Sequence, residues 1–384
     1  MIVLTVYAWI VAILSVIFFL FALVNAIWFR GYTKKPTMKN GPKVTVCIPA
    51  RNEEKNIEKC VRSLLNQTYK NYDIVVLNDN SDDNTGAILE KLKKEYPDKL
   101  TILQGKKLEE GWTGKIFAMN QIVQKADGEY MLFTDADTVH TPTSISFDIT
   151  NLELHNADML SGYIKEDIGS FGELITIPLM YMLSTFVLPS FLNRITSTSA
   201  TTAAIGQYIV IKRKVFDAIG GYNTIKDFVS EDITLARVIK KNGYKTIFID
   251  CKSAASCRMY HGYKESVNGL TKNIFSFMNN KSFLLFPGLI ATFLFLALPF
   301  PLFVTTLVYD LVATSSISLV TLLLFVNVAI MFWVWLCVAI SQRSSIAIPF
   351  LYPILFYNIL YMAVRSYIRT KKGKGYVWKG RVVH

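Results

Sequence analysis

The sequence predicts an α/β domain built on a parallel sheet and inserted between apolar helices at the two ends of the chain. Two observations predict this architecture. Hydrophobic residues make up 52% of the 384 residues, with a mean hydropathy of +0.32, and the excess is concentrated in residues 2–29 and 283–364. Residues 41–280 carry charges throughout, and strand-like runs alternate there with helix-like runs, as in sheets wound by crossover helices.

The first apolar segment predicts a membrane helix. Residues 2–29 hold no charged side chain, Arg30 ends the run, and the length suffices to cross a bilayer. A cleaved signal peptide is the alternative. The run is too long for one, lacks a basic start and shows no small-residue cleavage site before Arg30. We therefore expect residues 1–30 to form a retained transmembrane helix.

The second apolar segment covers residues 283–366 and predicts further membrane helices. Asp310 and the pair Gln342-Arg343 divide it. The three candidate spans lie near residues 283–308, 316–340 and 346–364.

Basic residues predict how these segments are oriented, because loops rich in Lys and Arg stay in the cytoplasm. They follow the first span and fill the tail at 367–384. The domain at 41–280 and the tail are therefore both expected in the cytoplasm, in a multi-pass protein of the cell membrane. Three full spans between them would separate the two, so we expect one segment to be re-entrant or interfacial. The candidates are the segment with Pro287, Pro299 and Pro301 and the segment with Pro349 and Pro353, and the sequence leaves both open.

The formal charge of +12 has a simple origin in these basic flanks, which favour the anionic headgroups of membrane lipids. The sequence holds no nucleic-acid-binding motif, so we expect no nucleic-acid partner. Its five cysteines show no CxxC spacing, which indicates free thiols in a cytoplasmic domain. An oligomeric state is not indicated.

The middle domain begins with two strand–turn–helix units. "KVTVCIPARNEEKNIEKCVRSLL" predicts a strand closed by Pro49 and a helix capped by Asn52. "YDIVVLNDNSDDNTGAILEKLKKEY" repeats the pattern, with Asp79 at the strand end and Ser81 or Asp82 as the cap. "KLTILQG" and "EYMLFTDAD" predict two further strands, and "GKIFAMNQIVQKA" predicts the helix between them. Neither GxGxxG nor a P-loop is present, so a nucleotide must be held differently.

Polar clusters follow the strands, at the edge where parallel sheets bind ligands. Asp135 and Asp137 form one of them, and in an extended segment residues i and i+2 point the same way. Hard divalent ions such as Mg²⁺ or Mn²⁺ take carboxylate oxygens and share them with substrate phosphates. The pair therefore predicts a metal–diphosphate site. A solvated turn is the alternative, because Asp is common in turns.

The second half of the domain adds another acidic pair. "IGQYIVIKRKVFDAIGGYN" predicts a strand and a short helix, and Glu231-Asp232 then begins a helix that ends at Asn242-Gly243. Acids at a helix start can simply complement the helix dipole. They can also supply a general base for an acceptor hydroxyl.

The ordered set "CIPARNEE", "LNDNSDDNT", "GWTGK", "FTDADT", "GGYN" and "SEDITLARVIKKNGYK" resembles the family 2 glycosyltransferases over roughly residues 43–252. Each motif alone is weak, whereas the ordered set is highly specific. The resemblance implies a GT-A-like, nucleotide-sugar-binding Rossmann-type domain between N-terminal and C-terminal transmembrane helices. It also implies a hexosyltransferase with a UDP-sugar donor.

The resemblance assigns roles to individual residues. Asp135 and Asp137 would hold Mg²⁺ or Mn²⁺ and the diphosphate, with Asp137 as the metal ligand. Asp232 would be the base of an inverting displacement at the anomeric carbon. The further residues implied in nucleotide-sugar binding are Pro49, Ala50, Arg51, Glu53, Asp79 and Lys115.

The chain departs from the polysaccharide synthases of this family, because their Q/R-x-x-R-W motif is absent from "SCRMYHGYKESVNGLTKNIFSF". Arg258 and Tyr260 are available there for the acceptor or the sugar, together with Gln207 and Glu231. "CRMY", "GLTKN" and "VWKGR" resemble a narrower group, the hopanoid-associated and carotenoid-acid (diaponeurosporenoate-type) membrane glycosyltransferases.

Two apolar or basic segments remain. Residues 171–195 are apolar enough for a transmembrane span, but a span there would place the two acidic pairs on opposite sides of the membrane, which one active site does not allow. We expect interfacial helices that form an entrance for a lipid acceptor. The terminal "WKGR" predicts either a basic membrane anchor or a tail folded over the site, with Trp378 packed on the domain.

The leading hypothesis is a membrane-bound inverting glycosyltransferase that moves a single sugar from a UDP-sugar to a lipid acceptor at the cytoplasmic membrane face. The acceptor would be a terpenoid or carotenoid acid or a glycolipid precursor. A processive polysaccharide synthase is the alternative, and the missing motif and few spans oppose it. An inactive membrane adaptor on a transferase fold is another, and the intact acidic residues oppose it. The sugar, the acceptor and the metal stay open.

Overall fold

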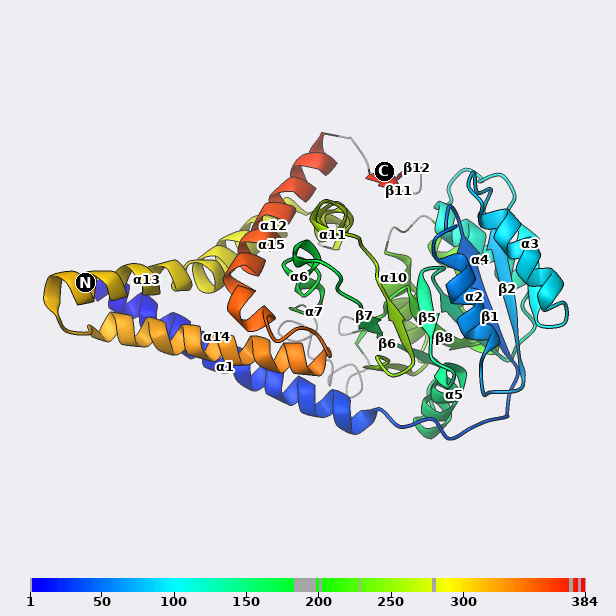
Figure 1. Cartoon of the computed structure of the whole chain (residues 1–384), viewed down its shortest axis with the longest axis horizontal. Helices are drawn as coiled ribbons and strands as arrows, with labels where there is room; N and C mark the ends of the chain where they lie inside the picture. Colours follow the sequence, from blue (N-terminus) through cyan, green and yellow to red (C-terminus); the bar gives the residue numbers. More distant parts are fainter. Residues whose placement is uncertain are drawn as a thin grey trace.

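The computed structural model describes residues 2–182, 198–199, 202–226, 228, 230–277, 281–372, 376–378 and 381–383. Figure 1 shows an α/β domain at one end, from which the helices α1 (Ile2–Tyr32), α13 (Pro299–Tyr309) and α14 (Leu319–Ser341) extend away. The prediction of a mixed α/β domain between N-terminal and C-terminal apolar helices is confirmed.

Seven strands form the central sheet, in the order β3-β2-β1-β4-β8-β6-β9. All neighbours are parallel except β8, which runs antiparallel to both β4 and β6. The expectation of a wholly parallel sheet is therefore wrong at β8. The chain leaves the sheet at the C-terminal end of β6 and re-enters it at the same end, so β8 runs in the opposite direction. The strands are β1 (Val44–Ala50), β2 (Tyr72–Asn78), β3 (Leu100–Gln104), β4 (Tyr130–Thr134), β6 (Met159–Tyr163), β8 (Tyr208–Lys212) and β9 (Thr246–Asp250).

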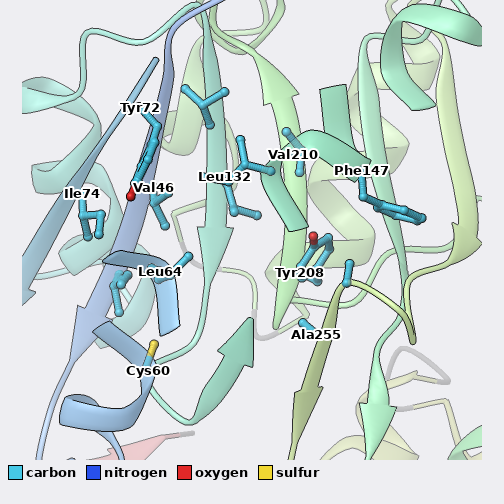
Figure 2. Close-up of a cluster of buried hydrophobic side chains, with 14 of the residues drawn as sticks. Val46, Cys60, Leu64, Tyr72, Ile74, Leu132, Phe147, Tyr208, Val210 and Ala255 are labelled. Atoms are coloured by element: carbon cyan, nitrogen blue, oxygen red, sulfur yellow. The ribbon is translucent and has the colours of Figure 1, made fainter. Parts of the chain in front are cut away.

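Side chains alternate across the sheet and build one hydrophobic cluster on each face. In β1, Val46 joins the first cluster and Cys47 the second. Figure 2 shows the first cluster, where Leu64 and Phe147 lie over strand residues such as Leu132. Each such fully buried side chain contributes about 1.5–3 kcal/mol. The first face is covered by α2 (Ile57–Leu65), α3 (Thr85–Glu95) and α5 (Ser144–Leu154), the second by α4 (Gly114–Lys125), α9 (Arg213–Ala218) and α10 (Glu231–Lys241).

The loops after β1 and β2 are bonded to each other, and their helices begin later than predicted. Asn52 has a φ of +52°; its N–H donates to Ser81 Oγ at 3.1 Å and its Oδ1 accepts from the Asp82 N–H at 2.9 Å. The helices α2 and α3 begin only at Ile57 and Thr85. The predicted caps Asn52, Ser81 and Asp82 are therefore wrong, because these residues connect the two loops instead.

A second, three-stranded sheet lies beside the central one. It has the order β5 (Thr138–His140), β10 (Ala255–Cys257) and β7 (Lys165–Glu166). Strand β5 directly follows Asp135 and Asp137, the first acidic pair, and β10 comes from residues more than 100 positions later. This sheet thus brings remote parts of the chain to that pair.

Within the described residues, four helices are long and apolar enough to cross a membrane: Ile2–Ile27, Ser282–Ala313, Leu319–Ser341 and Ile348–Lys371. The second comprises α12 (Ser282–Thr292), the π-helical turn Phe293–Ala297, α13 and the π-helical turn Asp310–Thr314. Helix α14 packs along α1 and α13, whereas α15 (Ile348–Lys371) packs mainly on α11 (Tyr263–Phe277) and α14.

Of the apolar stretch 171–195, the structure describes α6 (Phe171–Leu174) and α7 (Leu179–Met182), and residues 183–195 lie outside the described part. Tyr181 of α7 and Val267 of α11 share one cluster with Trp335 of α14. The domain therefore contacts the apolar helices through α7 and α11. In the tail, β11 (Tyr376–Trp378) and β12 (Arg381–Val383) pair as a hairpin; the prediction about the Trp378 side chain lies outside what is described.

Candidate active site

The loops after β1 and β2 meet at the carboxyl edge of the sheet. Asp79, which is buried, donates its N–H to Ala50 O at 2.8 Å. Arg51 Nη1 donates to Asp79 O at 2.6 Å, and the Glu53 N–H donates to Thr85 Oγ1 at 2.8 Å. Together with Pro49 at the end of β1, the residues predicted to hold the nucleobase and ribose thus lie in one connected loop pair.

The first acidic pair occupies a tight turn between β4 and β5. The Thr138 N–H donates to Asp135 O at 3.2 Å, which closes the turn. The expected extended segment is wrong here, and the two carboxyl groups have different partners. Asp135 Oδ1 lies 2.7 Å from Lys115 Nζ. Asp137 accepts from the Cys257 thiol, while its Oδ1 is buried and has no hydrogen-bond partner among the described residues.

Burial is the largest cause of the shifted pKa of Asp137. Together with the negative charges of Asp135 and Glu53, it raises this pKa to about 7. A divalent cation would remove the repulsion and satisfy the orphaned oxygen, and carboxylates are the ligands that Mg²⁺ and Mn²⁺ prefer. Asp135 and Asp137 therefore fit such an ion. No group of three or more His, Cys, Asp or Glu in the described ranges is arranged to hold a metal alone, so a bound phosphate would complete the shell.

Lys115 connects the two acidic pairs. It lies in the first turn of α4, 2.7 Å from Asp135 Oδ1 and 3.4 Å from Glu231 Oε1. Burial alone would lower the pKa of Lys115, but these two carboxylates outweigh it and the pKa is raised. The side chain is thus a fixed cation between residues that are about 100 positions apart in sequence.

Asp232 lies in the first turn of α10 and is held by two backbone N–H groups. Its Oδ2 accepts from Gly206 at 2.9 Å, and its Oδ1 accepts from Ile233 at 2.8 Å. Burial, and next the charge of Glu231, raise the pKa of Asp232 to about 6, against the opposing effect of Lys115. At neutral pH this carboxylate is charged and has a pKa close to the working range of a general base.

Of the remaining predicted residues, Gln207 adjoins this centre, whereas the described contacts of Tyr260 and Arg258 are with other segments. Gln207 follows Gly206; it is buried, and its Oε1 has no hydrogen-bond partner among the described residues. Tyr260 packs against Gly269 so closely that a Cβ there would lie 2.2 Å from the ring. Arg258 donates from Nε and Nη2 to the fully buried Glu173, at 3.2 and 3.0 Å.

Sequence reasoning missed several residues of the site. Gly206 leaves little room, because a Cβ there would lie 3.2 Å from Lys115 Nζ, and no local signal marks it. Glu173 also accepts the N–H groups of Gly169 and Gly262, at 2.6 and 2.7 Å. The spacing Ser170-x-x-Glu173, a capping-box pattern, could have indicated it.

Comparisons with known proteins show what the chain is similar to. Residues 45–220 match the model of glycosyl transferase family 2. The chain is 27% identical over 201 residues to β-monoglucosyldiacylglycerol synthase of Trichormus variabilis, covering 50% of this chain and 40% of that one. It is 24% identical over 233 residues to poly-β-1,6-N-acetyl-D-glucosamine synthase of Staphylococcus aureus, covering 60% and 52%. The chain thus spans about half of the length of these relatives.

One solved structure resembles nearly the whole chain. It is the mannosyltransferase PcManGT from Pyrobaculum calidifontis in complex with GDP-Man and Mn²⁺, with a TM-score of 0.54, 19% identity and coverage of 96% and 99%. At this identity the likeness shows the fold, which is of the GT-A type. The segment that matches glycosyl transferase family 2 thus lies, with a fold of the GT-A type, between the apolar helices.

Proposed function

We propose that the chain is an inverting, membrane-bound glycosyltransferase that transfers one sugar from a UDP-sugar to a lipid acceptor. The observation that carries this proposal is the network in which Lys115 joins Asp135 to Glu231, next to Asp232. A cation site for a diphosphate and a carboxylate base thus face one space. The chemistry of glycosyl transfer needs both groups in one site.

The donor would bind along the carboxyl edge of the sheet. The loops with Arg51 and Asp79 would hold the nucleoside, and Asp135 and Asp137 would hold the diphosphate through Mg²⁺ or Mn²⁺. Bound there, the cation would stabilise the negative charge on the leaving diphosphate. Lys115 is close enough to Asp135 to add a second positive charge at the same place.

The transfer itself would exchange one bond for another at the anomeric carbon. The bond from this carbon to the diphosphate oxygen breaks, and a bond to the acceptor oxygen forms on the opposite face. Asp232, with a pKa of about 6, takes the proton of a hydroxyl acceptor. Gly206 holds the carboxylate in place through its N–H.

A lipid acceptor is supported by what surrounds the site. The elements α7 and α11 belong to the domain but pack into the cluster of apolar helices that includes Trp335. An acceptor with an apolar tail could therefore approach from the bilayer. The similarity to a β-monoglucosyldiacylglycerol synthase agrees with this. A diacylglycerol, a terpenoid or carotenoid acid and other glycolipid precursors are the candidate acceptors.

The proposal is tested with the purified chain in lipid nanodiscs. UDP-glucose, UDP-galactose, UDP-N-acetylglucosamine and GDP-mannose are each incubated with diacylglycerol, a terpenoid acid or polyprenyl phosphate, and products are identified by mass. A lipid that gains the mass of one sugar, with no product from Asp232→Asn, supports the proposal. Long carbohydrate products would instead indicate a polysaccharide synthase, and no transfer from any donor would overturn the proposal.

The orientation of the chain in the membrane is part of the proposal. Polar residues of α15 bond the domain: Asn358 Nδ2 donates to Ile175 O at 2.8 Å, and Arg365 Nη2 to Asn268 Oδ1 at 2.6 Å. In Figure 1, α15 runs at an angle to α1 and α14. We infer that α15 is the predicted interfacial segment, at the cytoplasmic membrane face. The chain then crosses the membrane three times, and the domain and the basic tail both lie in the cytoplasm.

This topology is tested with fusions to the C-terminus in a bacterial host. Green fluorescent protein should fluoresce at that position, and alkaline phosphatase should be inactive. The reverse pair of results would mean that α15 crosses the membrane.

A further inference from the structure

His140 is a buried histidine that neither the motifs nor the proposed chemistry uses. It is the last residue of β5, and 4% of its surface is exposed. Two remote elements fix its backbone: the N–H of His140 donates to Ser63 Oγ of α2 at 3.0 Å, and the residue pairs with Ala255 of β10. The imidazole ring is therefore attached to a firmly held part of the domain.

The ring forms a hydrogen bond across the turn that carries the first acidic pair. His140 Nε2 and Thr134 Oγ1 share this bond at 3.0 Å, and both side chains are buried. Thr134 is the last residue of β4 and directly precedes Asp135, whereas His140 follows Asp137 at the end of β5. The bond thus joins the strand that enters the turn to the strand that leaves it.

The ring also contacts the central sheet. It stacks on Tyr208 of β8, with 5.6 Å between the ring centroids. Tyr208 is the partner of Thr134 in the sheet and lies in the first hydrophobic cluster (Figure 2). Its hydroxyl donates to Oδ1 of the buried Asp148 in α5, at 2.8 Å. A continuous chain of contacts therefore leads from the end of β4 through His140 and Tyr208 to α5.

These polar side chains are costly to bury. His140 Nδ1, Thr138 Oγ1 and Asp148 Oδ2 are buried and have no hydrogen-bond partner among the described residues. Apolar side chains of similar size would avoid this cost. Burial lowers the pKa of His140 to about 3, so the ring is neutral and acts through its hydrogen bond rather than through a charge. The stability of the fold therefore does not explain why polar groups occupy these positions.

We propose that His140 is a positioning residue, whose ring holds the turn with Asp135 and Asp137 in the shape that binds the cation. The inference rests on the metal site of the proposed function and deepens it, because it assigns the geometry of the two carboxylates to a residue outside the DxD motif. His140 acts through the end of β4 and is not itself a ligand. The alternative is a polar network that serves only the packing of the domain.

Removing both partners of the Thr134–His140 bond separates these two roles without any transfer reaction. Thr134→Val combined with His140→Phe replaces them by apolar side chains of similar shape and leaves neither partner unsatisfied. The Tm of this double variant in EDTA should therefore be no lower than that of the wild type. The full-length chain in detergent is then titrated with Mn²⁺ in the presence of UDP, and free Mn²⁺ is measured by electron paramagnetic resonance. The Kd for Mn²⁺ should rise about tenfold or more in the double variant.

His155→Phe is the matched control. This histidine bonds the backbone oxygen of Tyr32 at 2.9 Å and stacks on the ring of Tyr32, at the end of α1, so its loss should leave the Kd unchanged. A double variant that binds Mn²⁺ as tightly as the wild type would overturn the inference. Weaker binding together with a lower Tm in EDTA would also overturn it, because the network would then serve the packing. If the double variant does not fold, Thr134→Val alone replaces it, and an unchanged Kd again overturns the inference.

The wild type separates this inference from the proposed function. If the wild type binds no Mn²⁺ with UDP, the metal site fails and the inference fails with it. If the wild type binds Mn²⁺ and the double variant binds it equally well, only the inference fails.

Discussion

Lys115 Nζ lies 2.7 Å from Asp135 Oδ1, and this ion pair joins the proposed donor half of the site to the half that holds the base. The same ammonium group lies 3.4 Å from Glu231 and lowers the pKa of Asp232. One lysine therefore affects both the diphosphate site and the proton acceptor. The first two predictions follow from this arrangement.

Removing the lysine charge should shift the acidic limb of the pH profile. In Lys115→Met the pKa of Asp232 rises, because a positive charge that favours the carboxylate is gone. The acidic midpoint of log(kcat/KM) should move to higher pH, and the maximal rate should fall about 100-fold or more. Lys125→Met, at the exposed end of the same helix, is the control and should keep the wild-type profile.

In the wild type, transfer to a hydroxyl acceptor should be lost as the pH falls through about 6. The active form of Asp232 is the deprotonated one, and its pKa is about 6, so the rate rises with pH up to a plateau. Asp232→Asn should remove transfer and keep donor binding, measured as stabilisation against heat by UDP with Mn²⁺. Equal rates for Asp232→Asn and the wild type would exclude a role as base.

Asp137→Asn should remove the dependence on metal without unfolding the protein. Asn has nearly the same shape as Asp and keeps the contact with Cys257, so the Tm in EDTA should stay close to that of the wild type. Loss of the anionic ligand should weaken Mn²⁺ binding and abolish metal-dependent turnover. Normal metal-dependent turnover by this variant would contradict the assignment of Asp137.

Glu173 should stabilise the fold rather than bind substrate. Burial raises its pKa, but Arg258 and the N–H groups of Gly169 and Gly262 outweigh burial and lower the pKa to about 2. The stabilisation is complete above the unfolded pKa of 4.5 and is lost as the pH falls towards 2. Glu173→Gln should reduce the free energy of unfolding by about 2 kcal/mol at pH 7. Denaturant unfolding checks this, with the exposed Glu265→Gln as control.

The fourth prediction also bears on Arg258, which the sequence suggests for the acceptor or the sugar. Its guanidinium group is bonded to Glu173, at 3.0 Å from Nη2, and this contact holds the segment before α11 against the start of α6. If Arg258 contacts substrate, it must do so while bonded to Glu173. Arg258→Lys tests this, because Lys keeps the charge and loses the two-pronged contact.

The sequence by itself determined the local elements and the chemistry of the strand ends. Short continuous apolar runs in β1 and β4, apolar spacing in α2 and α10, and long runs without charge are all local patterns, set by residues within one element. The acidic pair Asp135 and Asp137 after a strand and the helix start at Glu231-Asp232 were therefore visible before any fold was known.

Only the tertiary structure decided which remote groups meet. The direction of β8, the bond from Gly206 to Asp232 and the Lys115–Asp135 ion pair all depend on the order of strands in the sheet. Strand order is fixed by packing between elements that are far apart in the chain, and no local periodicity encodes it. The motifs thus predict the proposed reaction, and the order of strands determines which residues surround its site.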